Sequence, residues 1–310
     1  MVQNAYHALV PTSTSGLARD TAPPTHHLTA MVRVKDEARF LPEWLAHHVN
    51  VGFEHVYVYD NNSTDDIEHV IAPFVERGLA TYVHWPTVPA SPSSNVDFLT
   101  RFGAANEWVA FFDADEFLVE SSPGMLREVL AEAGRAPAIA VCWRYYGSSG
   151  HETVPDGLIT AAFDHADAGY NPHVKVIARP AMVRRYRNSH NLYYRGGRLA
   201  RTPEGRRVFG SFVTPAETPR LLLHHYVYRS REDYERKARH GFVDAGGAKE
   251  KARTAERSDR EFTKHNDVYA PLPAAILAAT VERLADLGYG PTVGATRAER
   301  SSTGEPSASG

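Results

Sequence analysis

Three carboxylates follow a run of apolar and aromatic residues in the segment WVAFFDADEF, residues 108–117. Asp113 and Asp115 lie two residues apart, so in an extended chain their side chains point the same way and can share one cation. A magnesium or manganese ion held by one or two carboxylates usually takes further oxygen ligands from substrate phosphates. The segment therefore predicts a site for a metal diphosphate, with a capped helix end or a solvated turn as the alternative for so short an acidic motif.

An alternation of strands and helices positions this acidic cluster. Apolar runs predict strands, and apolar residues at helical spacing between them predict helices, which together favour an α/β fold with a mostly parallel sheet. In open α/β sheets, ligands bind beyond the carboxyl ends of strands. Both DNNSTDD (60–66) and DADE (113–116) follow predicted strands. The predicted strands are 28–34, 55–59, 80–85, 108–112 and 138–146, and the predicted helices are 41–52, 67–78 and 122–134.

Composition indicates an ordinary globular chain. With 310 residues, 43% of them hydrophobic, the chain can bury a substantial core. A formal net charge of -3 gives no global reason to expect nucleic acid or an anionic membrane as the partner. Cys142 is the single cysteine, no signal peptide or membrane span is evident, and a cytoplasmic location fits best. We expect disordered tails at 1–27 and 291–310, a catalytic domain at 28–243 and a C-terminal helical extension at 244–290.

Five separated segments carry a resemblance to a known family. They are VKDEARFLPEWLAHHVNVGFEHVYVYDNNSTDD (34–66), WVAFFDADEFL (108–118), YYGSSGHETVPDGL (145–158), HVKVIARP (173–180) and HHYVYRSREDYERKARHG (224–241). In order and approximate spacing they closely resemble glycosyltransferase family 92 and its bacterial family-2-like relatives of the GT-A fold. Three departures are Asp36 where the family usually has Asn, a Pro/Ser-rich segment between Trp85 and Trp108 in place of a Gln- and Tyr-containing helix, and Arg229 in place of Lys.

The resemblance implies a metal-dependent transferase with a nucleotide-sugar donor. Asp113 and Asp115 would bind Mn²⁺ or Mg²⁺, and His225, which stands at the position of the family's His-Tyr pair, would complete the metal ligands. Neighbouring residues of a strand point to opposite faces, so only one of His224 and His225 can face the metal. Glu116 would support the loop or contact the donor sugar. The alternative for His225 is a histidine of the core or surface without a metal. The alternative for Asp60 is a residue of the turn before a helix. The implied nucleotide-sugar site comprises Lys35, Glu37, Asp60, Asn62, Asp113, Lys175 and Lys237.

An inverting transferase also needs a general base within reach of the acceptor hydroxyl. Glu152, Asp164 and His190 are the candidates, and the sequence leaves the choice among them open. We expect transfer of a hexose from a UDP-sugar. The alternatives are a nucleotidyltransferase of related architecture and a non-catalytic module that binds nucleotide sugars.

A basic segment gives the one indication of the acceptor. Residues 175–207 contain ten Lys or Arg residues and a single acid, Glu204. Guanidinium groups bind carboxylates and phosphates in pairs of hydrogen bonds, and the interleaved Tyr rings can stack on sugars. An anionic acceptor is therefore one hypothesis, and a solvated basic loop is the other. The sequence leaves the oligomeric state open.

Overall fold

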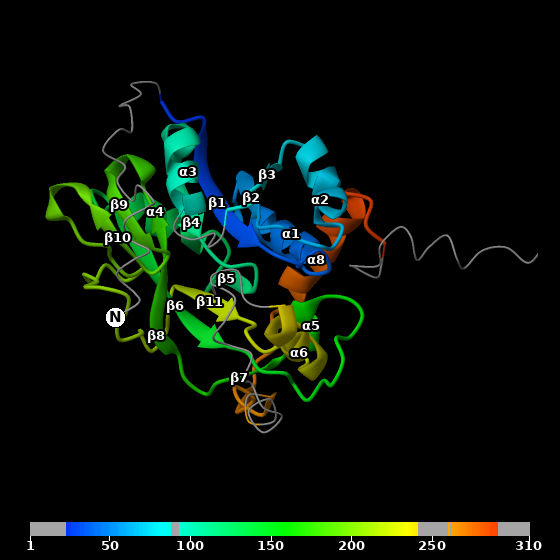
Figure 1. Ribbon diagram of the computed structural model, residues 1–310. Coiled ribbons are helices and arrows are strands. Elements are labelled where there is room, and N and C mark those ends of the chain that lie inside the picture. Colours follow the sequence, from blue (N-terminus) through cyan, green and yellow to red (C-terminus); the bar gives the residue numbers. More distant parts are fainter. Residues whose placement is uncertain (1–22, 88–92, 241–259, 261, 291–310) are drawn as a thin grey trace, which may run out of the picture.

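The structure is a computed structural model that describes residues 23–87, 93–240, 260 and 262–290. An eight-stranded sheet forms its centre, in the order β3-β2-β1-β4-β8-β6-β11-β5 (Figure 1). Strands β3, β2, β1 and β4 are parallel, β8 is antiparallel to both β4 and β6, and β11 is parallel to β6 but antiparallel to β5. Six of the eight strands thus share one direction, which confirms the predicted α/β class with a mostly parallel sheet. The strands are β1 (His26–Val34), β2 (His55–Asp60), β3 (Ala80–His84), β4 (Asn106–Phe111), β5 (Glu116–Glu120), β6 (Ala138–Tyr145), β8 (Asn171–Ala178) and β11 (Leu221–His225).

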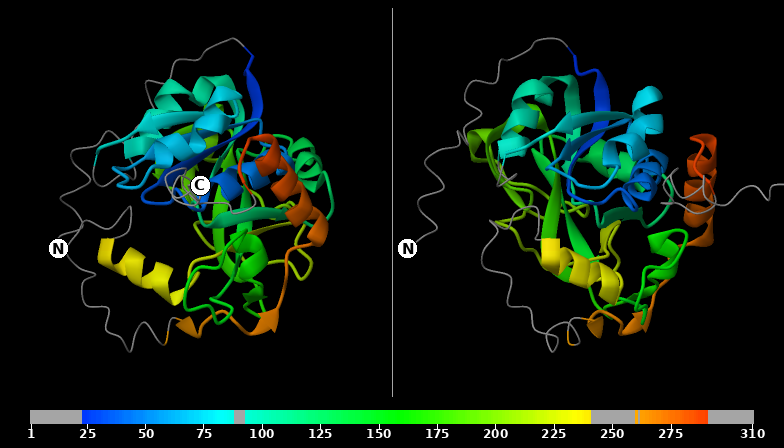
Figure 2. Two further views of the ribbon diagram at one scale, coloured as in Figure 1. Left: turned by 90° about the vertical axis from the view of Figure 1, so that its right-hand side faces the viewer. Right: turned by 45° about the vertical axis from the view of Figure 1, so that its right-hand side comes forward.

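Helices cover both faces of this sheet (Figures 1 and 2). One core joins α1, α2, α4 and α8 to the sheet, for example through Leu45, Ile71 and Leu284. The other core lies beneath α3 and includes Phe98 and Tyr186. This arrangement of a mostly parallel sheet between helices is the one expected of the GT-A fold. The helices are α1 (Leu41–Val51), α2 (Ile67–Glu76), α3 (Ser93–Arg101), α4 (Met125–Glu132), α5 (Ile159–Ala162), α6 (Arg231–His240) and α8 (Ala274–Asp286).

Smaller elements decorate the sheet edges. A hairpin packs on the same face as α3, because Val183, Tyr186 and Leu192 contribute to the same core as Phe98. Two short strands pair near the carboxyl edge of the sheet. The hairpin is β9 (Val183–Asn188) and β10 (Asn191–Tyr194), the short pair is β7 (His165–Ala166) and β12 (Val268–Tyr269), and the 3-10 helices are η2 (Gly103–Ala105), η3 (Pro180–Met182) and η4 (Arg195–Gly197).

Local signals explain where the first helix begins and ends. Pro42 occupies the first turn of α1, where its missing N–H breaks no helical hydrogen bond. Gly52 follows with φ of 114°, a conformation that favours glycine, and its N–H donates to the carbonyls of His48 and Val49. Before α6, the Ser230 hydroxyl accepts from the Asp233 N–H at 3.0 Å and so caps the start of this helix.

Three elements differ from the sequence-based expectation. Strand β1 begins at His26, two residues before the predicted strand. The Pro/Ser-rich segment before Trp108 contains helix α3, because Phe98 and Leu99 bury an apolar face against the sheet. Strand β5, which was not predicted, begins at the last residue of the acidic cluster and pairs with β11, the strand that carries His224 and His225. Residues 1–22, 241–259 and 291–310, which include most of the predicted tails, lie outside the described residues.

The C-terminal helix belongs to the folded body. The Arg77 guanidinium of α2 donates to the carbonyl of Asp286 at 3.1 Å, and the Tyr289 hydroxyl donates to the carbonyl of Val70. Leu284 is buried in the core shared with α1. Helix α8, which lies within the predicted C-terminal extension, therefore packs onto the sheet domain. In the part of the chain that the structure describes, no helix is long and apolar enough to span a bilayer.

Candidate active site

The acidic cluster lies at the carboxyl edge of the parallel strands, as the sequence predicted. Strand β4 ends at Phe111, the turn carries Asp113 and Asp115, and Glu116 is the first residue of β5. The N–H of Asp113 donates to the Glu116 carboxylate at 2.9 Å, which closes the turn. The Trp44 indole of α1 donates to the Glu116 carbonyl at 2.8 Å and fixes the turn against the helix.

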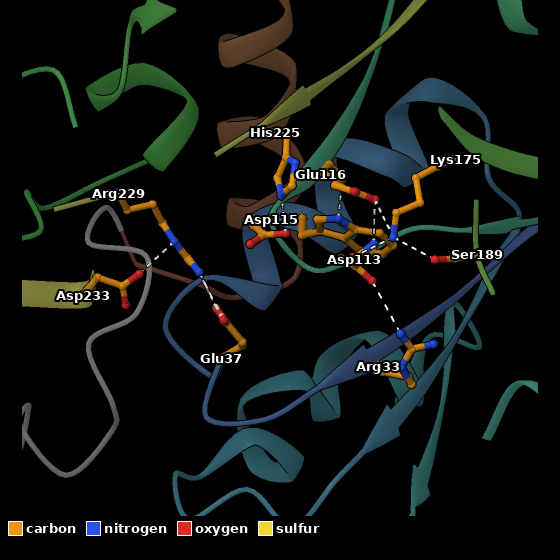
Figure 3. A network of polar contacts seen from close by, with 11 residues as sticks. Arg33, Glu37, Asp113, Asp115, Glu116, Lys175, Ser189, His225, Arg229 and Asp233 are labelled. Atoms are coloured by element: carbon orange, nitrogen blue, oxygen red, sulfur yellow. Dashed lines mark hydrogen bonds and ion pairs between the residues drawn. The ribbon is translucent and has the colours of Figure 1, made fainter. Parts of the chain in front are cut away.

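A buried lysine holds one side of the cluster (Figure 3). Lys175 of β8 has a side chain only 1% exposed, and its Nζ lies 2.6 Å from Asp113 and 3.5 Å from the fully buried Glu116. Nζ also donates to the Ser189 hydroxyl at 3.0 Å. Burial by itself would raise the pKa of Asp113, but Lys175 and then Arg33 outweigh it and hold that pKa below its usual value. Asp113 is therefore an anion bound to a cation of the protein.

Burial has the opposite outcome at Glu116. It raises the pKa of this carboxyl to about 7, although Lys175 opposes the change. Lys175 keeps its proton, since the attraction of Asp113 and Glu116 raises its pKa against the effect of burial. The cluster thus combines the ionised carboxylate of Asp113, the ammonium of Lys175 and the Glu116 carboxyl, whose pKa is about 7.

Asp115 and His225 form the other side of the cluster. Antiparallel pairing of β11 with β5 sets His225 opposite Glu116 and brings its Nε2 to 3.4 Å from Asp115 Oδ1 (Figure 3). Burial would lower the pKa of His225, but Asp115 raises it above its ordinary value. His224 points away and lies with its ring 4.6 Å from that of Tyr146, where burial lowers its pKa to about 3. The structure thus directs His225, and not His224, toward Asp115.

The fit of these side chains to a metal ion is uneven. The described residues contain no group of three or more His, Cys, Asp or Glu that could hold an ion. Asp113 is turned toward Lys175. Asp115 and His225 do fit as a pair, because neighbouring octahedral ligands at about 2.1 Å from an ion lie about 3 Å apart. His225 Nδ1 and Glu116 Oε1 are also buried without a hydrogen-bond partner among the described residues, as expected of polar atoms at a ligand site.

An aromatic cluster connects His190 with this site. The Trp143 ring of β6 lies 5.3 Å from that of His190 and 4.7 Å from that of His225. His190 Nδ1 lies 2.9 Å from the carbonyl of Val174. A carbonyl can only accept, so Nδ1 carries the proton and Nε2 is left as an acceptor. Burial lowers the pKa of His190 to about 4, helped by Lys175, so the ring is neutral at pH 7.

The other two candidate bases have different surroundings. The Glu152 side chain is 63% exposed and forms an ion pair with Arg231 at 2.6 Å. Asp164 lies 2.7 Å from Nδ1 of His165. His190 is thus the candidate whose ring contacts Trp143, the residue that also contacts the His225 ring.

The predicted nucleotide residues are engaged within the protein. Both Asp60 oxygens are bonded, one by the Ser63 N–H at 3.0 Å and the other by the Tyr82 hydroxyl at 2.7 Å. Glu37 binds the fully buried Arg229 at 2.9 Å, and Arg229 also contacts Asp233 at 3.1 Å (Figure 3). These contacts agree with the alternative in which Asp60 stabilises a turn, and a nucleotide role for Asp60 and Glu37 stays a prediction.

Three further residues were predicted to bind the nucleotide sugar, and each has different surroundings. Lys35 is partly buried just beyond β1. Asn62 is exposed with φ of 57°, and its side-chain amide donates to the carbonyl of Pro86 at 3.2 Å. Lys237 belongs to α6, but its side chain lies outside the described part. Lys175 was predicted to contact the donor, whereas its described partners are Asp113, Glu116 and Ser189.

Sequence reasoning missed three contributors to the site. Arg33 of β1 lies 3.8 Å from Asp113, Ser189 binds Lys175, and the Trp143 ring contacts His225. Arg33 carried a signal, since it is a charged residue inside a predicted strand near its carboxyl end. Ser189 and Trp143 carried none, because the turn of the β9–β10 hairpin and strand β6 bring them to the cluster only in the folded protein.

The sheet and the acidic edge define an α/β protein with a candidate ligand site beyond its parallel strands. A family model, Glycosyltransferase family 92, matches residues 30–190. This span is more than half of the chain, and the chain belongs to glycosyltransferase family 92.

Family 92 proteins from plants align with part of the chain. One from Oryza sativa subsp. japonica is 30% identical over 159 residues, which cover 50% of this chain and 27% of the rice protein. One from Ricinus communis is 30% identical over 143 residues, which cover 44% of this chain and 26% of the Ricinus protein. The chain therefore spans about a quarter of the length of these curated relatives. A solved structure, S. aureus TarS 1-349 in complex with UDP-GlcNAc, is 15% identical with a TM-score of 0.38, over 84% of this chain and 80% of that one.

Proposed function

We propose that this protein transfers a hexose from a UDP-sugar to an acceptor hydroxyl, with inversion at the anomeric carbon. The observation that carries the proposal is the cluster of Asp113, Asp115, Glu116 and His225 at the carboxyl edge of the sheet, in a chain of glycosyltransferase family 92. Ligands of open α/β sheets bind at this edge. The cluster supplies the charged groups that a donor diphosphate needs there.

Asp115 and His225 would hold the donor diphosphate through Mn²⁺ or Mg²⁺. A bound divalent ion would offset the negative charge that develops on the leaving diphosphate. Asp113 has a different part, since Lys175 and Arg33 hold it in place and it fixes the turn that presents Asp115. The ammonium of Lys175 would also reduce the repulsion between the carboxylates and the donor phosphates.

His190 is the base that the geometry favours. Its Nε2 lone pair is free of the Val174 contact, and the ring is neutral at pH 7, as a proton acceptor must be. The His190 ring contacts that of Trp143, and the Trp143 ring also contacts that of His225. His190 would therefore take the acceptor proton beside the diphosphate site. Glu152 is ion-paired with Arg231, and Asp164 is hydrogen-bonded to the His165 ring.

Products formed from a panel of nucleotide sugars with manganese test this function. Free sugar with UDP identifies a glycosyltransferase, pyrophosphate identifies a nucleotidyltransferase, and binding without turnover identifies a non-catalytic module. Either of the last two results refutes the proposal.

The variant Asp115→Asn tests the role of the cluster. It removes one anionic oxygen at unchanged size, and we expect turnover to fall by about 100-fold or more. Asp156→Asn is the matched control, because the Asp156 side chain is 87% exposed and lies on the loop before α5. Near-native turnover of Asp115→Asn, or equal losses in both variants, would show that the cluster does not hold the donor.

A further inference from the structure

An open groove of about 1170 Å³ lies along the β9–β10 hairpin and the chain that follows it. Four arginines line it, Arg184 and Arg185 from β9 and Arg195 and Arg198 from the segment after β10. A neighbouring cavity of about 350 Å³ shares Arg198 and is also lined by four arginines. Among the described residues, no Asp or Glu lines either cavity. The other arginines of the second cavity are Arg135, Arg201 and Arg207.

The contacts described for Arg185, Arg198 and Arg201 do not neutralise the charge of these three guanidinium groups. Arg185 lies 4.3 Å above the ring of Tyr193. Arg198 donates to the carbonyl of Arg135 at 3.1 Å, and Arg201 donates to that of Gly205 at 3.3 Å. Rings and carbonyl oxygens carry no net charge. The groove is therefore strongly positive in a chain whose net charge is -3.

Arginines just outside the groove have acidic partners. Arg179 lies 3.6 Å from Glu107, and Arg220 lies 2.5 Å from Glu132. The linings of the two cavities, by contrast, contain no Asp or Glu among the described residues. The contrast favours the anion-binding hypothesis for the groove over the solvated-loop alternative.

The groove ends beside the proposed catalytic centre. His190, in the turn of the hairpin, is part of its lining and contacts Trp143. The preceding residue, Ser189, binds Lys175 of the acidic cluster. The same hairpin thus carries the arginines on its strands and joins the cluster at its turn. A molecule lying in the groove would reach the proposed base with one end.

Aromatic side chains accompany the arginines. Phe209 lines the groove with 72% of its surface exposed, and Tyr193 lines it with 40% exposed. Such rings offer flat apolar faces on which a planar or ring-shaped ligand can stack. Guanidinium groups bind carboxylates and phosphates through paired hydrogen bonds. The lining therefore combines groups for an oxyanion with groups for a ring.

We propose that this groove binds the acceptor, and that the acceptor is a sugar bearing a phosphate or carboxylate group. The inference rests on the proposed glycosyl transfer, and it adds the chemical class of the second substrate. The oxyanion would bind among the arginines, while the hydroxyl to be glycosylated would lie at the His190 end.

Calorimetric titration with glucose 6-phosphate, glucuronic acid and glucose tests the groove without requiring turnover. The wild type should bind at least one charged sugar about tenfold or more tightly than glucose, and added salt should weaken that binding, since charges are screened over about 8 Å at physiological ionic strength. The charged sugar that binds identifies phosphate or carboxylate as the recognised group.

The variant Arg185→Gln/Arg195→Gln should remove this preference. Arg101→Gln/Arg127→Gln is the control with the same loss of charge, because Arg101 of α3 and Arg127 of α4 lie outside both cavity linings. The groove variant should bind UDP and manganese as the wild type does. Weaker UDP binding in that variant would instead make the groove a donor site and overturn the inference.

The remaining outcomes separate the two proposals. A wild type that binds no UDP refutes the proposed function. A wild type that binds UDP but binds glucose and charged sugars equally refutes the groove inference alone, as does an equal loss of binding in the control variant. Binding of a short single-stranded RNA in place of charged sugars would also overturn the inference.

Discussion

Replacing Lys175 with Met should destabilise the protein through the carboxyls that Lys175 leaves behind. Lys175→Met keeps the length of the side chain but removes an ammonium that is 1% exposed. Removing one partner of a buried ion pair costs about 3–5 kcal/mol. Two features of the site place the expected cost at the lower end of this range. Asp113 is 43% exposed and partly screened by water, and Glu116 can take up a proton. We expect a loss of about 3 kcal/mol in the free energy of unfolding.

Urea unfolding at pH 7, followed by circular dichroism, measures this loss. Lys264→Met is the control, since Lys264 is exposed and its change should stay within about 0.5 kcal/mol. A second variant, Lys175→Met/Glu116→Gln, removes the stranded buried carboxyl as well. If the cost arises as described, Glu116→Gln should be less harmful in the Lys175→Met background than in the wild type, by about 0.5–3 kcal/mol. A loss below about 1 kcal/mol in Lys175→Met, or strictly additive losses, would refute the reasoning.

Two further predictions concern stability against pH and donor binding. Burial raises the pKa of Glu43 from 4.5 to about 7. Its folded form therefore favours the proton, and stability present below pH 4.5 should be lost as pH rises through 7, by about 3 kcal/mol at most. Denaturant unfolding between pH 4.5 and 8 should show this fall in the wild type and a flatter profile in Glu43→Gln, and equal slopes would contradict it. For Asp60→Ala we expect weaker UDP binding by calorimetry, with Ser63→Ala as the comparison. An equal loss in Ser63→Ala would show that Asp60 acts through its turn, and unchanged binding in both would place the nucleotide elsewhere.

Local patterns predicted the first half of the fold well. Strands β1 to β4 and helices α1, α2 and α4 lie where apolar spacing placed them, because each buries a continuous apolar face and is bounded by Gly, Pro or polar residues. Helix α3 was missed, since its Pro/Ser-rich surroundings masked the short apolar face of Phe98 and Leu99. Strand β5 was missed because its apolar residues directly follow the acidic motif without a turn signal.

The candidate site also has features that the sequence predicted and features that it could not predict. Asp113, Asp115 and Glu116 share one segment, so their proximity could be read from the sequence. The alternation of a strand showed only that one of His224 and His225 can face the metal, and the choice of His225 came from the family resemblance. The pairing of β11 with β5 directs His225 toward Asp115. The position of Asp113 could not be predicted, since it depends on a lysine 62 residues away.

The sequence by itself determined the α/β class, the acidic motif after a buried strand and the excess of arginine after residue 175. Each of these is a property of neighbouring residues, and short-range periodicity and composition express it. Tertiary structure decided which partners the charges have. The insertion of the antiparallel strand β8 between β4 and β6 buries Lys175 against Asp113 and Glu116. The folding of the β9–β10 hairpin onto the sheet gathers arginines into a groove that ends at His190. Such contacts join distant parts of the chain, so they depend on how the strands pack together and cannot be read from neighbouring residues.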